Sequence, residues 1–112
     1  MTPLRSPITT HVLDTARGKP AAGLAVVLEL KDREHWIVLS RGTTDAEGRA
    51  SSLLPFDHGL TIGTYRLTFA VGLWQDGFFP EVSITFRVTD PDEHYHVPLL
   101  LSPFGYSTYR GA

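Results

Sequence analysis

Two histidines stand two residues apart near the end of the chain, in the stretch His94-Tyr95-His96. In a β-strand, residues at positions i and i+2 share a face, so we expect both imidazoles on one face and Tyr95 on the other. Neutral imidazole is a common metal ligand, and His11 could supply a third one. The H-x-H spacing is a weak signal for a metal, and each histidine taken alone is more simply explained as a side chain held by hydrogen bonds.

His11 and Arg49 are the other residues whose types and settings suggest chemistry. His11 lies in a strand-like run over residues 8–13, where alternation places it on the same face as Thr9. A titratable ring in such a strand needs a polar partner or a cleft. Arg49 follows a turn-forming stretch at residues 45–48. It is either an exposed edge-strand arginine or a fixed cation for an anionic substrate or a developing oxyanion.

Composition excludes several other function classes. The 112 residues contain no cysteine, which excludes disulfides and thiolate metal sites, and the net charge of -2 gives no electrostatic basis for binding nucleic acid. No apolar run approaches the ~20 residues that span a bilayer, and residues 1–7 lack the apolar segment of a secretory signal. Neither a G-x-S-x-G nucleophile elbow nor a glycine-rich phosphate loop is present. We therefore expect a cytoplasmic protein with no membrane or nucleic-acid partner.

Alternating apolar and polar residues dominate the chain and predict short β-strands. The clearest run covers residues 82–88, and similar runs cover 8–13, 25–30, 36–39, 65–71, 95–101 and 106–109. Glycine, proline and small polar residues separate these runs, and residues 31–34 form a predicted hairpin connection. Residues 71–78 could hold one short helical turn. The pattern predicts an all-β sandwich in a single domain over residues 1–112.

Four segments resemble the motifs of the 5-hydroxyisourate hydrolases, the transthyretin-related enzymes of urate breakdown. The first is Ile-Thr-Thr-His-Val-Leu-Asp-Thr at residues 8–15, followed by Gly-Lys-Pro-Ala at 18–21. The second is Thr-Asp at 44–45 with Gly-Arg at 48–49, and the third is Phe-Phe-Pro-Glu-Val at 78–82. The fourth and longest runs from residue 94 to the end, where the family typically has HYHVPLLLSP followed by YSTYRGS. The motifs occur in family order over nearly the whole chain.

The resemblance implies a transthyretin-like β-sandwich of two four-stranded sheets with one short helix. It implies that His11, Arg49 and His96 are catalytic, with His94 in a supporting role at best. The implied substrate-binding residues are His11, Arg49, Tyr109, Arg110, Gly111 and Ala112. The family's final serine is Ala112 here, so the hydroxyl is lost while the terminal carboxylate remains.

The activity that the resemblance implies is hydrolysis of 5-hydroxyisourate to 2-oxo-4-hydroxy-4-carboxy-5-ureidoimidazoline, in urate catabolism towards allantoin. The implied assembly is a homotetramer, a dimer of dimers with active sites in the channel between the dimers. No cofactor or metal is implied. Two alternatives stay open at this point. One is a non-enzymatic transthyretin-like protein that binds a small molecule, and the other is a zinc hydrolase with His11, His94 and His96 as ligands.

Overall fold

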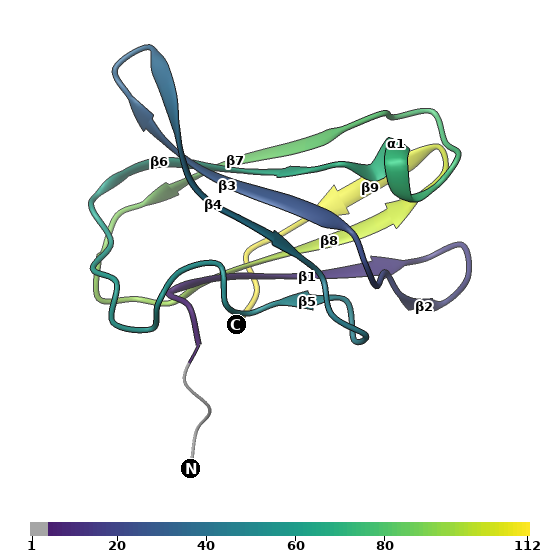
Figure 1. Ribbon diagram of the computed structural model, residues 1–112, viewed down its shortest axis with the longest axis horizontal. Coiled ribbons are helices and arrows are strands. Elements are labelled where there is room, and N and C mark those ends of the chain that lie inside the picture. The colour runs from purple at the N-terminus through teal and green to yellow at the C-terminus, as the bar shows by residue number, and fades with distance from the viewer. Residues whose placement is uncertain (1–4) are drawn as a thin grey trace.

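The computed structural model describes residues 5–112 (Figure 1). Residues 1–4, part of the stretch in which no secretory signal was expected, lie outside the described residues. The elements in chain order are β1 (Ile8–Asp14), β2 (Lys19–Pro20), β3 (Ala25–Asp32), β4 (His35–Thr43), β5 (Arg49–Ala50), β6 (Gly63–Phe69), α1 (Val71–Trp74), β7 (Val82–Val88), β8 (Tyr95–Ser102) and β9 (Gly105–Thr108).

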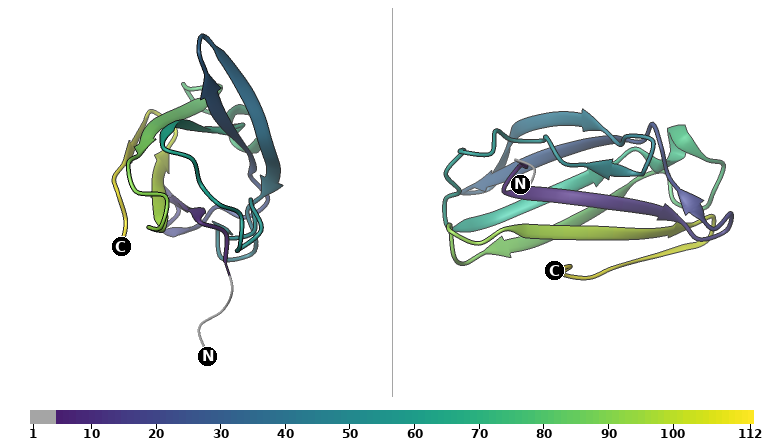
Figure 2. Two further views of the ribbon diagram at one scale, coloured as in Figure 1. Left: turned by 90° about the vertical axis from the view of Figure 1, so that its left-hand side faces the viewer. Right: turned by 90° about the horizontal axis from the view of Figure 1, so that it is seen from below.

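These strands form two sheets that enclose an apolar core (Figure 2). One sheet has the order β4-β3-β6-β7, and the other has the order β2-β1-β8-β9 with β5 also paired to β1. The predicted all-β sandwich with one short helix is confirmed. The prediction of two four-stranded sheets is wrong for the second sheet, which has five strands because the two-residue strands β2 and β5 both pair with β1.

The alternating apolar and polar residues of the sequence lie on opposite faces of the strands. In β7, Val82, Ile84 and Val88 are buried while the residues between them are exposed or partly exposed. Each fully buried aliphatic or aromatic side chain contributes about 1.5–3 kcal/mol relative to an exposed one. The largest fully buried side chains are Tyr65, Phe69, Ile8, Leu24, Leu28, Leu67, Leu99, Leu101, Val12, Val26, Val71 and Val82.

Two short connections behave as their residues predict. The expected hairpin at residues 31–34 is a two-residue turn between β3 and β4, with Arg33 at φ 59°. The expected helical turn is α1, whose Trp74 donates an indole N–H to the Ala22 carbonyl oxygen at 2.7 Å. Within residues 5–112, no helix is long and apolar enough to cross a membrane.

The central position of β1 in the five-stranded sheet brings the residues of the candidate site together. On one side β1 pairs in parallel with β8, which places Thr9 opposite His96 although the two are 87 positions apart in the sequence. On its other side β1 pairs antiparallel with β5, which places His11 opposite Arg49. Two segments that are distant in the sequence, β5 and β8, therefore meet along the central strand β1.

Candidate active site

Four polar side chains share the outer face of the five-stranded sheet. Residues directly opposite one another in neighbouring strands project to the same face. The pairing of Thr9 with His96 and of His11 with Arg49 therefore places all four side chains on one face. The opposite face of β1 packs into the core, where Val12 is fully buried. The structure thus brings together His11, Arg49 and His96, the three residues for which catalysis was predicted.

A tight turn over residues 45–49 holds His11 and Arg49 in place. Asp45 Oδ1 accepts hydrogen bonds from the backbone N–H of Glu47 at 2.9 Å and of Arg49 at 3.0 Å. The Glu47 carbonyl oxygen lies 2.8 Å from His11 Nε2. Because a carbonyl oxygen only accepts, Nε2 of His11 carries a proton. A neutral His11 therefore has its lone pair on Nδ1.

Gly48 connects this turn to the central strand. Its carbonyl oxygen accepts a hydrogen bond from the backbone N–H of Val12 at 2.7 Å, next to His11. Its φ of +77° lies in the left-handed region that favours glycine. A Cβ at this position would clash with the carbonyl oxygen of Val12. The glycine is therefore required both by its backbone conformation and by the close approach of the turn to β1.

The turn also sets the charges around Arg49. The backbone hydrogen bond from Arg49 lowers the pKa of Asp45 most; burial opposes this shift, and the hydrogen bond from Glu47 and the charges of Arg49 and His11 add to it. Asp45 is therefore an anion at neutral pH. The ion pairs among residues 5–112 do not involve Arg49, whose side chain is exposed. Its guanidinium is thus available to an anionic or polarised carbonyl oxygen.

His94 and His96 meet at the hydroxyl group of Thr9. Thr9 Oγ1 lies 3.0 Å from His94 Nε2 and 2.8 Å from His96 Nδ1. The two rings stack with centroids 6.3 Å apart and an interplanar angle of 17°. Tyr95, between them in sequence, is buried in the core. The prediction that the two histidines share a face is confirmed.

Both imidazoles are held in a setting that favours the neutral form. Burial is the main cause that lowers the pKa of His96, followed by the positive charges of Arg49, His11 and Arg5, while a hydrogen bond with the backbone of Thr9 raises it. Burial also lowers the pKa of His94, with Arg5 and His96 as further causes. A neutral imidazole beside a free guanidinium is suited to accept a proton from water.

The last residues of the chain fold back over His96. The backbone N–H of Gly111 donates to the His96 carbonyl oxygen at 2.8 Å. A Cβ on Gly111 would lie 2.5 Å from His96 Cδ2, so the absence of a side chain lets the segment lie against the ring. Arg110 lines a different cavity from Arg49 and contacts Glu93 and Tyr95. Its Nη2 donates to Glu93 Oε2 at 2.7 Å, and its guanidinium lies 4.6 Å from the centre of the Tyr95 ring.

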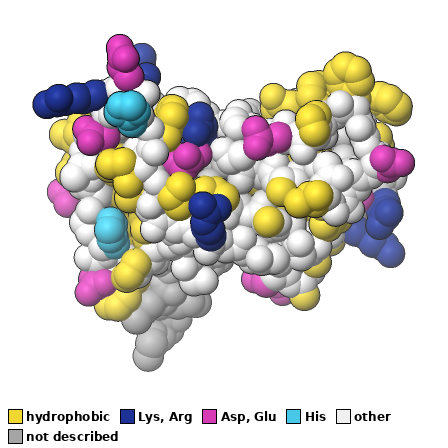
Figure 3. Space-filling model, turned by 45° about the horizontal axis from the view of Figure 1, so that its top comes forward, with side chains coloured by type: hydrophobic (Ala, Val, Ile, Leu, Met, Phe, Trp, Pro, Cys, Tyr) yellow, Lys and Arg dark blue, Asp and Glu magenta, His cyan; other side chains and the backbone are white. Residues whose placement is uncertain are grey.

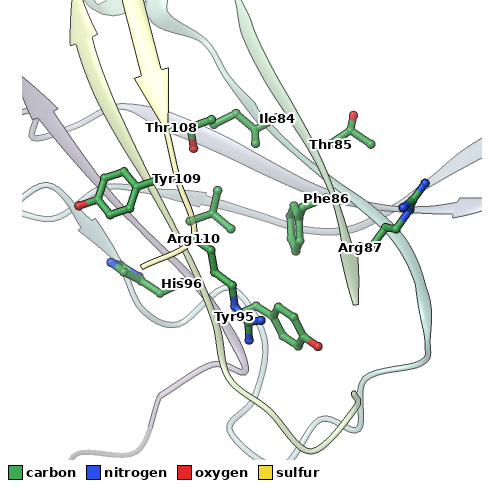
Figure 4. Close-up of a pocket in the computed structure, with 10 residues that line it drawn as sticks. Ile84, Thr85, Phe86, Arg87, Tyr95, His96, Thr108, Tyr109 and Arg110 are labelled. Carbon is green, nitrogen blue, oxygen red and sulfur yellow. The ribbon is translucent and has the colours of Figure 1, made fainter. Parts of the chain in front are cut away.

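Two cavities adjoin His96. The first, here the Arg49 cavity, has a volume of about 80 Å³ and is lined by Arg5, Thr9, Thr10, Arg49, Ser51, His96 and Ala112. The second, here the Arg110 cavity, has a volume of about 230 Å³ and lies between β7, β8 and the C-terminal segment (Figure 4). Tyr109 and Arg110 line this larger cavity. The Arg49 cavity is the candidate active site, because Arg49 and His96, two of the three residues for which catalysis was predicted, line it together.

The described residues do not provide the ligands that a zinc hydrolase would need. Within residues 5–112, no three histidine, aspartate or glutamate side chains are grouped closely enough to hold a metal ion. His11, His94 and His96 therefore do not form the three-ligand site that the sequence left open.

Comparison with known proteins places the chain in a family. The sequence profile of the HIUase/Transthyretin family matches residues 8–111. The chain belongs to this family. A 5-hydroxyisourate hydrolase from Salmonella dublin is 46% identical over 110 residues, which cover 94% of this chain and 80% of the relative.

Solved structures of the HIUase/Transthyretin family share the fold. The 5-hydroxyisourate hydrolase of Klebsiella pneumoniae has a TM-score of 0.82 and 33% identity, covering 94% of this chain and 97% of that one. Sea bream transthyretin in complex with thyroxine has a TM-score of 0.86 and 28% identity, covering 95% of each chain. The backbone is therefore common to a hydrolase and to a protein that binds thyroxine.

Sequence reasoning missed the residues that hold the predicted site in place. Thr9 was assigned to the face of His11, but its contact with both His94 and His96 depends on the parallel pairing of β1 and β8. Asp45 lies in the turn predicted at residues 45–48. An aspartate at the start of a turn commonly accepts hydrogen bonds from the backbone N–H groups that follow it, as Asp45 does here. No local signal indicated that the same turn would bind His11.

Proposed function

We propose that this chain is a 5-hydroxyisourate hydrolase that converts 5-hydroxyisourate to 2-oxo-4-hydroxy-4-carboxy-5-ureidoimidazoline in urate catabolism towards allantoin. The observation that carries the proposal is the convergence of His11, Arg49 and His96 on one outer sheet face, beside the Arg49 cavity. The curated relative from Salmonella dublin, named for this activity, supports it.

The reaction needs a base, an anion-stabilising group and a proton for the leaving nitrogen. Water attacks a ring carbonyl, the adjacent C–N bond breaks, the carbonyl carbon becomes a carboxylate and the nitrogen takes up a proton. His96 and His11 orient and activate the water, and the lowered pKa of His96 keeps it in the neutral, proton-accepting form. The exposed guanidinium of Arg49 holds the substrate and stabilises the oxyanion that forms at the attacked carbonyl.

The alternative is a non-enzymatic transthyretin-like binding protein, and it is supported by the similarity of the backbone to that of a transthyretin. Sea bream transthyretin matches this chain with a TM-score of 0.86, against 0.82 for the Klebsiella hydrolase. Fold likeness alone does not separate the two functions. The side chains favour the hydrolase, because a carrier needs neither neutral imidazoles nor a free guanidinium around one small cavity.

We also propose the homotetramer, a dimer of dimers, as the working assembly. At about 80 Å³ the Arg49 cavity is smaller than the several hundred cubic ångströms typical of small-molecule sites, so a second chain is expected to complete it. The strands β7 and β9 each lie at an edge of their sheet, where they are open to pairing with another chain. Exposed apolar side chains, including Leu73, Phe78 and Phe104, gather near α1 and the β8–β9 turn (Figure 3). Such patches are typical of interfaces.

The cytoplasm is the proposed location, supported by the absence of cysteine from the sequence. No metal or other cofactor is part of the proposed mechanism, because imidazole base catalysis and a guanidinium supply the groups that the hydrolysis needs.

The deciding experiment generates 5-hydroxyisourate from urate with urate oxidase and follows its decay with and without the purified protein. Decay that accelerates in proportion to protein concentration supports the hydrolase. The matched control is a double variant, Arg49→Ala with His96→Ala. In its presence 5-hydroxyisourate should decay at the same rate as in buffer. If the unmodified protein does not accelerate decay but binds the substrate or an analogue by calorimetry, the binding-protein alternative takes its place.

A further inference from the structure

The hydroxyl group of Thr9 contacts both stacked imidazoles, those of His94 and His96. It lies 3.0 Å from His94 Nε2 and 2.8 Å from His96 Nδ1, and Thr9 is only 4% exposed. A hydroxyl has one proton and accepts through its oxygen. Both rings could donate to the hydroxyl oxygen, but its own proton would then lack an acceptor, since His94 and His96 are its partners among residues 5–112. With both rings neutral, the arrangement that satisfies every group has Thr9 donate to one ring and accept from the other. The proton positions on His94 and His96 are therefore tied to each other.

The surroundings of His96 decide between the two possible arrangements. Its Nδ1 is engaged by Thr9, so Nε2 is the nitrogen left for the Arg49 cavity. That cavity is also lined by Arg5 and Arg49, both positively charged. Cationic N–H groups attract a bare nitrogen lone pair and repel another N–H. These two cations therefore favour a bare Nε2 and a protonated Nδ1 on His96.

We propose that Thr9 and His94 are positioning residues that fix the tautomer of His96 for the hydrolysis described above. His96 Nδ1–H donates to Thr9 Oγ1, and the Thr9 hydroxyl donates to Nε2 of His94. His96 Nε2 is then unprotonated and available to take the proton of the attacking water. This inference rests on the proposed function for its catalytic consequence, while the tautomer itself is a property of the resting protein.

His94 has a defined part in this arrangement because it receives the Thr9 hydroxyl proton. Without an acceptor at that place, the hydroxyl is free to turn and donate to His96 Nδ1 instead. His96 would then carry its proton on Nε2, the wrong nitrogen for a base. Loss of a tautomer-fixing partner is costly in enzymes that use an imidazole base, even where the geometry is otherwise kept.

The direct test is nitrogen NMR of the histidine rings in the full-length protein near neutral pH. Ring ¹⁵N shifts and their couplings to the carbon-bound ring protons show which nitrogen carries the proton. We expect His96 to be protonated at Nδ1 and His94 to be unprotonated at Nε2. Thr9→Val, which keeps the shape but removes the hydroxyl, should shift His96 towards the Nε2–H form. A resting protein in which His96 carries its proton on Nε2 overturns the proposal, whatever the activity.

Kinetics test the consequence with matched variants. Thr9→Val and His94→Ala should each lower kcat by about 10- to 100-fold with little change in KM, within the range of one acid–base contribution. Thr9→Ser, which restores a hydroxyl, and His94→Gln, whose amide oxygen can accept at a similar position, should recover most of the rate. The double variant Thr9→Val/His94→Ala should be no slower than Thr9→Val alone, because both changes break one chain of hydrogen bonds.

A control separates this effect from general damage to the sheet. Thr15 lies beyond the other end of β1, and its hydroxyl donates to the Leu101 carbonyl oxygen at 3.0 Å. Thr15→Val should leave kcat and the His96 tautomer unchanged. Unchanged kcat in Thr9→Val also overturns the proposal. If Thr9→Val does not fold, the tautomers of the unmodified protein and of His94→Ala decide the question. An inactive protein with the expected tautomer refutes the proposed function and leaves the hydrogen-bond arrangement intact.

Discussion

Replacing Gly48 by alanine should damage both the stability of the protein and its active site. The φ of +77° at this position costs a residue with a side chain about 1–2 kcal/mol. The new Cβ would also clash with the carbonyl oxygen of Val12, so the turn must move away from β1. This movement strains the 2.7 Å hydrogen bond from the Val12 N–H to the Gly48 carbonyl oxygen. Leaving that buried N–H unsatisfied costs a further ~1–3 kcal/mol.

Gly23 offers a matched control because its φ is also +77° but nothing lies within 4 Å of a Cβ placed there. Gly23→Ala should therefore lower the free energy of unfolding by about 1–2 kcal/mol, the conformational cost alone. Gly48→Ala should lower it by roughly 2–5 kcal/mol, the sum of the conformational cost and the lost hydrogen bond. Urea denaturation at equal protein concentration measures both values.

The same comparison isolates the effect on catalysis. The turn at residues 45–49 binds His11 through the Glu47 carbonyl oxygen and fixes the backbone of Arg49, so its displacement moves two site residues at once. A shift of ~1 Å in such groups can reduce turnover about 100-fold. We expect Gly48→Ala to lose most of its kcat/KM for 5-hydroxyisourate while Gly23→Ala keeps it. Equal stability losses in the two variants, together with unchanged kcat/KM in Gly48→Ala, would refute this account of the turn.

Five further predictions concern the site and the protonation of His96. Arg49→Ala and His96→Ala should each lower the rate roughly 100-fold or more. The free energy of unfolding should change by under ~0.5 kcal/mol for the exposed Arg49 and by about 0.5–1.5 kcal/mol for His96, which loses its hydrogen bond with Thr9. A variant that keeps its full rate removes that residue from the site. Ala112→Ser should change the rate only modestly, by about tenfold or ~1.4 kcal/mol of barrier at most, and a gain of several orders of magnitude in the decay assay would show that the serine hydroxyl is central. Chelator treatment should leave turnover unchanged, whereas a loss reversed by added zinc would favour a zinc hydrolase. Because burial and the charges of Arg49, His11 and Arg5 hold the pKa of His96 below its ordinary 6.5, kcat/KM should persist below pH 6.5 and fall only as the pH passes the lowered value. In the same window the unfolded chain binds the proton first, so the free energy of unfolding should decrease as the pH falls from 6.5 towards the lowered pKa, as denaturation at several pH values would show.

Much of the fold follows from local pattern. The strand predicted at residues 82–88 is β7 with the same bounds, because seven alternating residues define two faces without ambiguity. The strands β2 and β5 were not predicted as such, because two residues carry no period. The extra strand in the second sheet comes from backbone pairing with β1, which no side-chain pattern encodes.

The site was predictable as a set of residues but not as an arrangement. The shared face of His94 and His96 follows from strand alternation and is confirmed by their stacked rings. The parallel contact of β1 with β8 joins segments at opposite ends of the chain, and such pairing leaves no trace in either segment alone. For the same reason the Thr9 hydroxyl and the Asp45 turn became visible as supports of the site only in the structure. The catalytic roles of His11, Arg49 and His96 stay predictions until the variants are measured.

The separation of inner and outer faces explains how one sandwich can serve two functions. In β1 the buried Ile8 and Val12 belong to the core, while Thr9 and His11 project outward from the same strand. Outward residues can therefore change without disturbing the packing that maintains the fold. This chain matches a thyroxine-bound transthyretin with a TM-score of 0.86 and a hydrolase with a TM-score of 0.82. The backbone is therefore almost equally similar to a binding protein and to an enzyme. Under the proposed function, a catalyst on this scaffold is distinguished by an outer face that holds neutral imidazoles, an exposed guanidinium and the hydroxyl and turn that keep them in place.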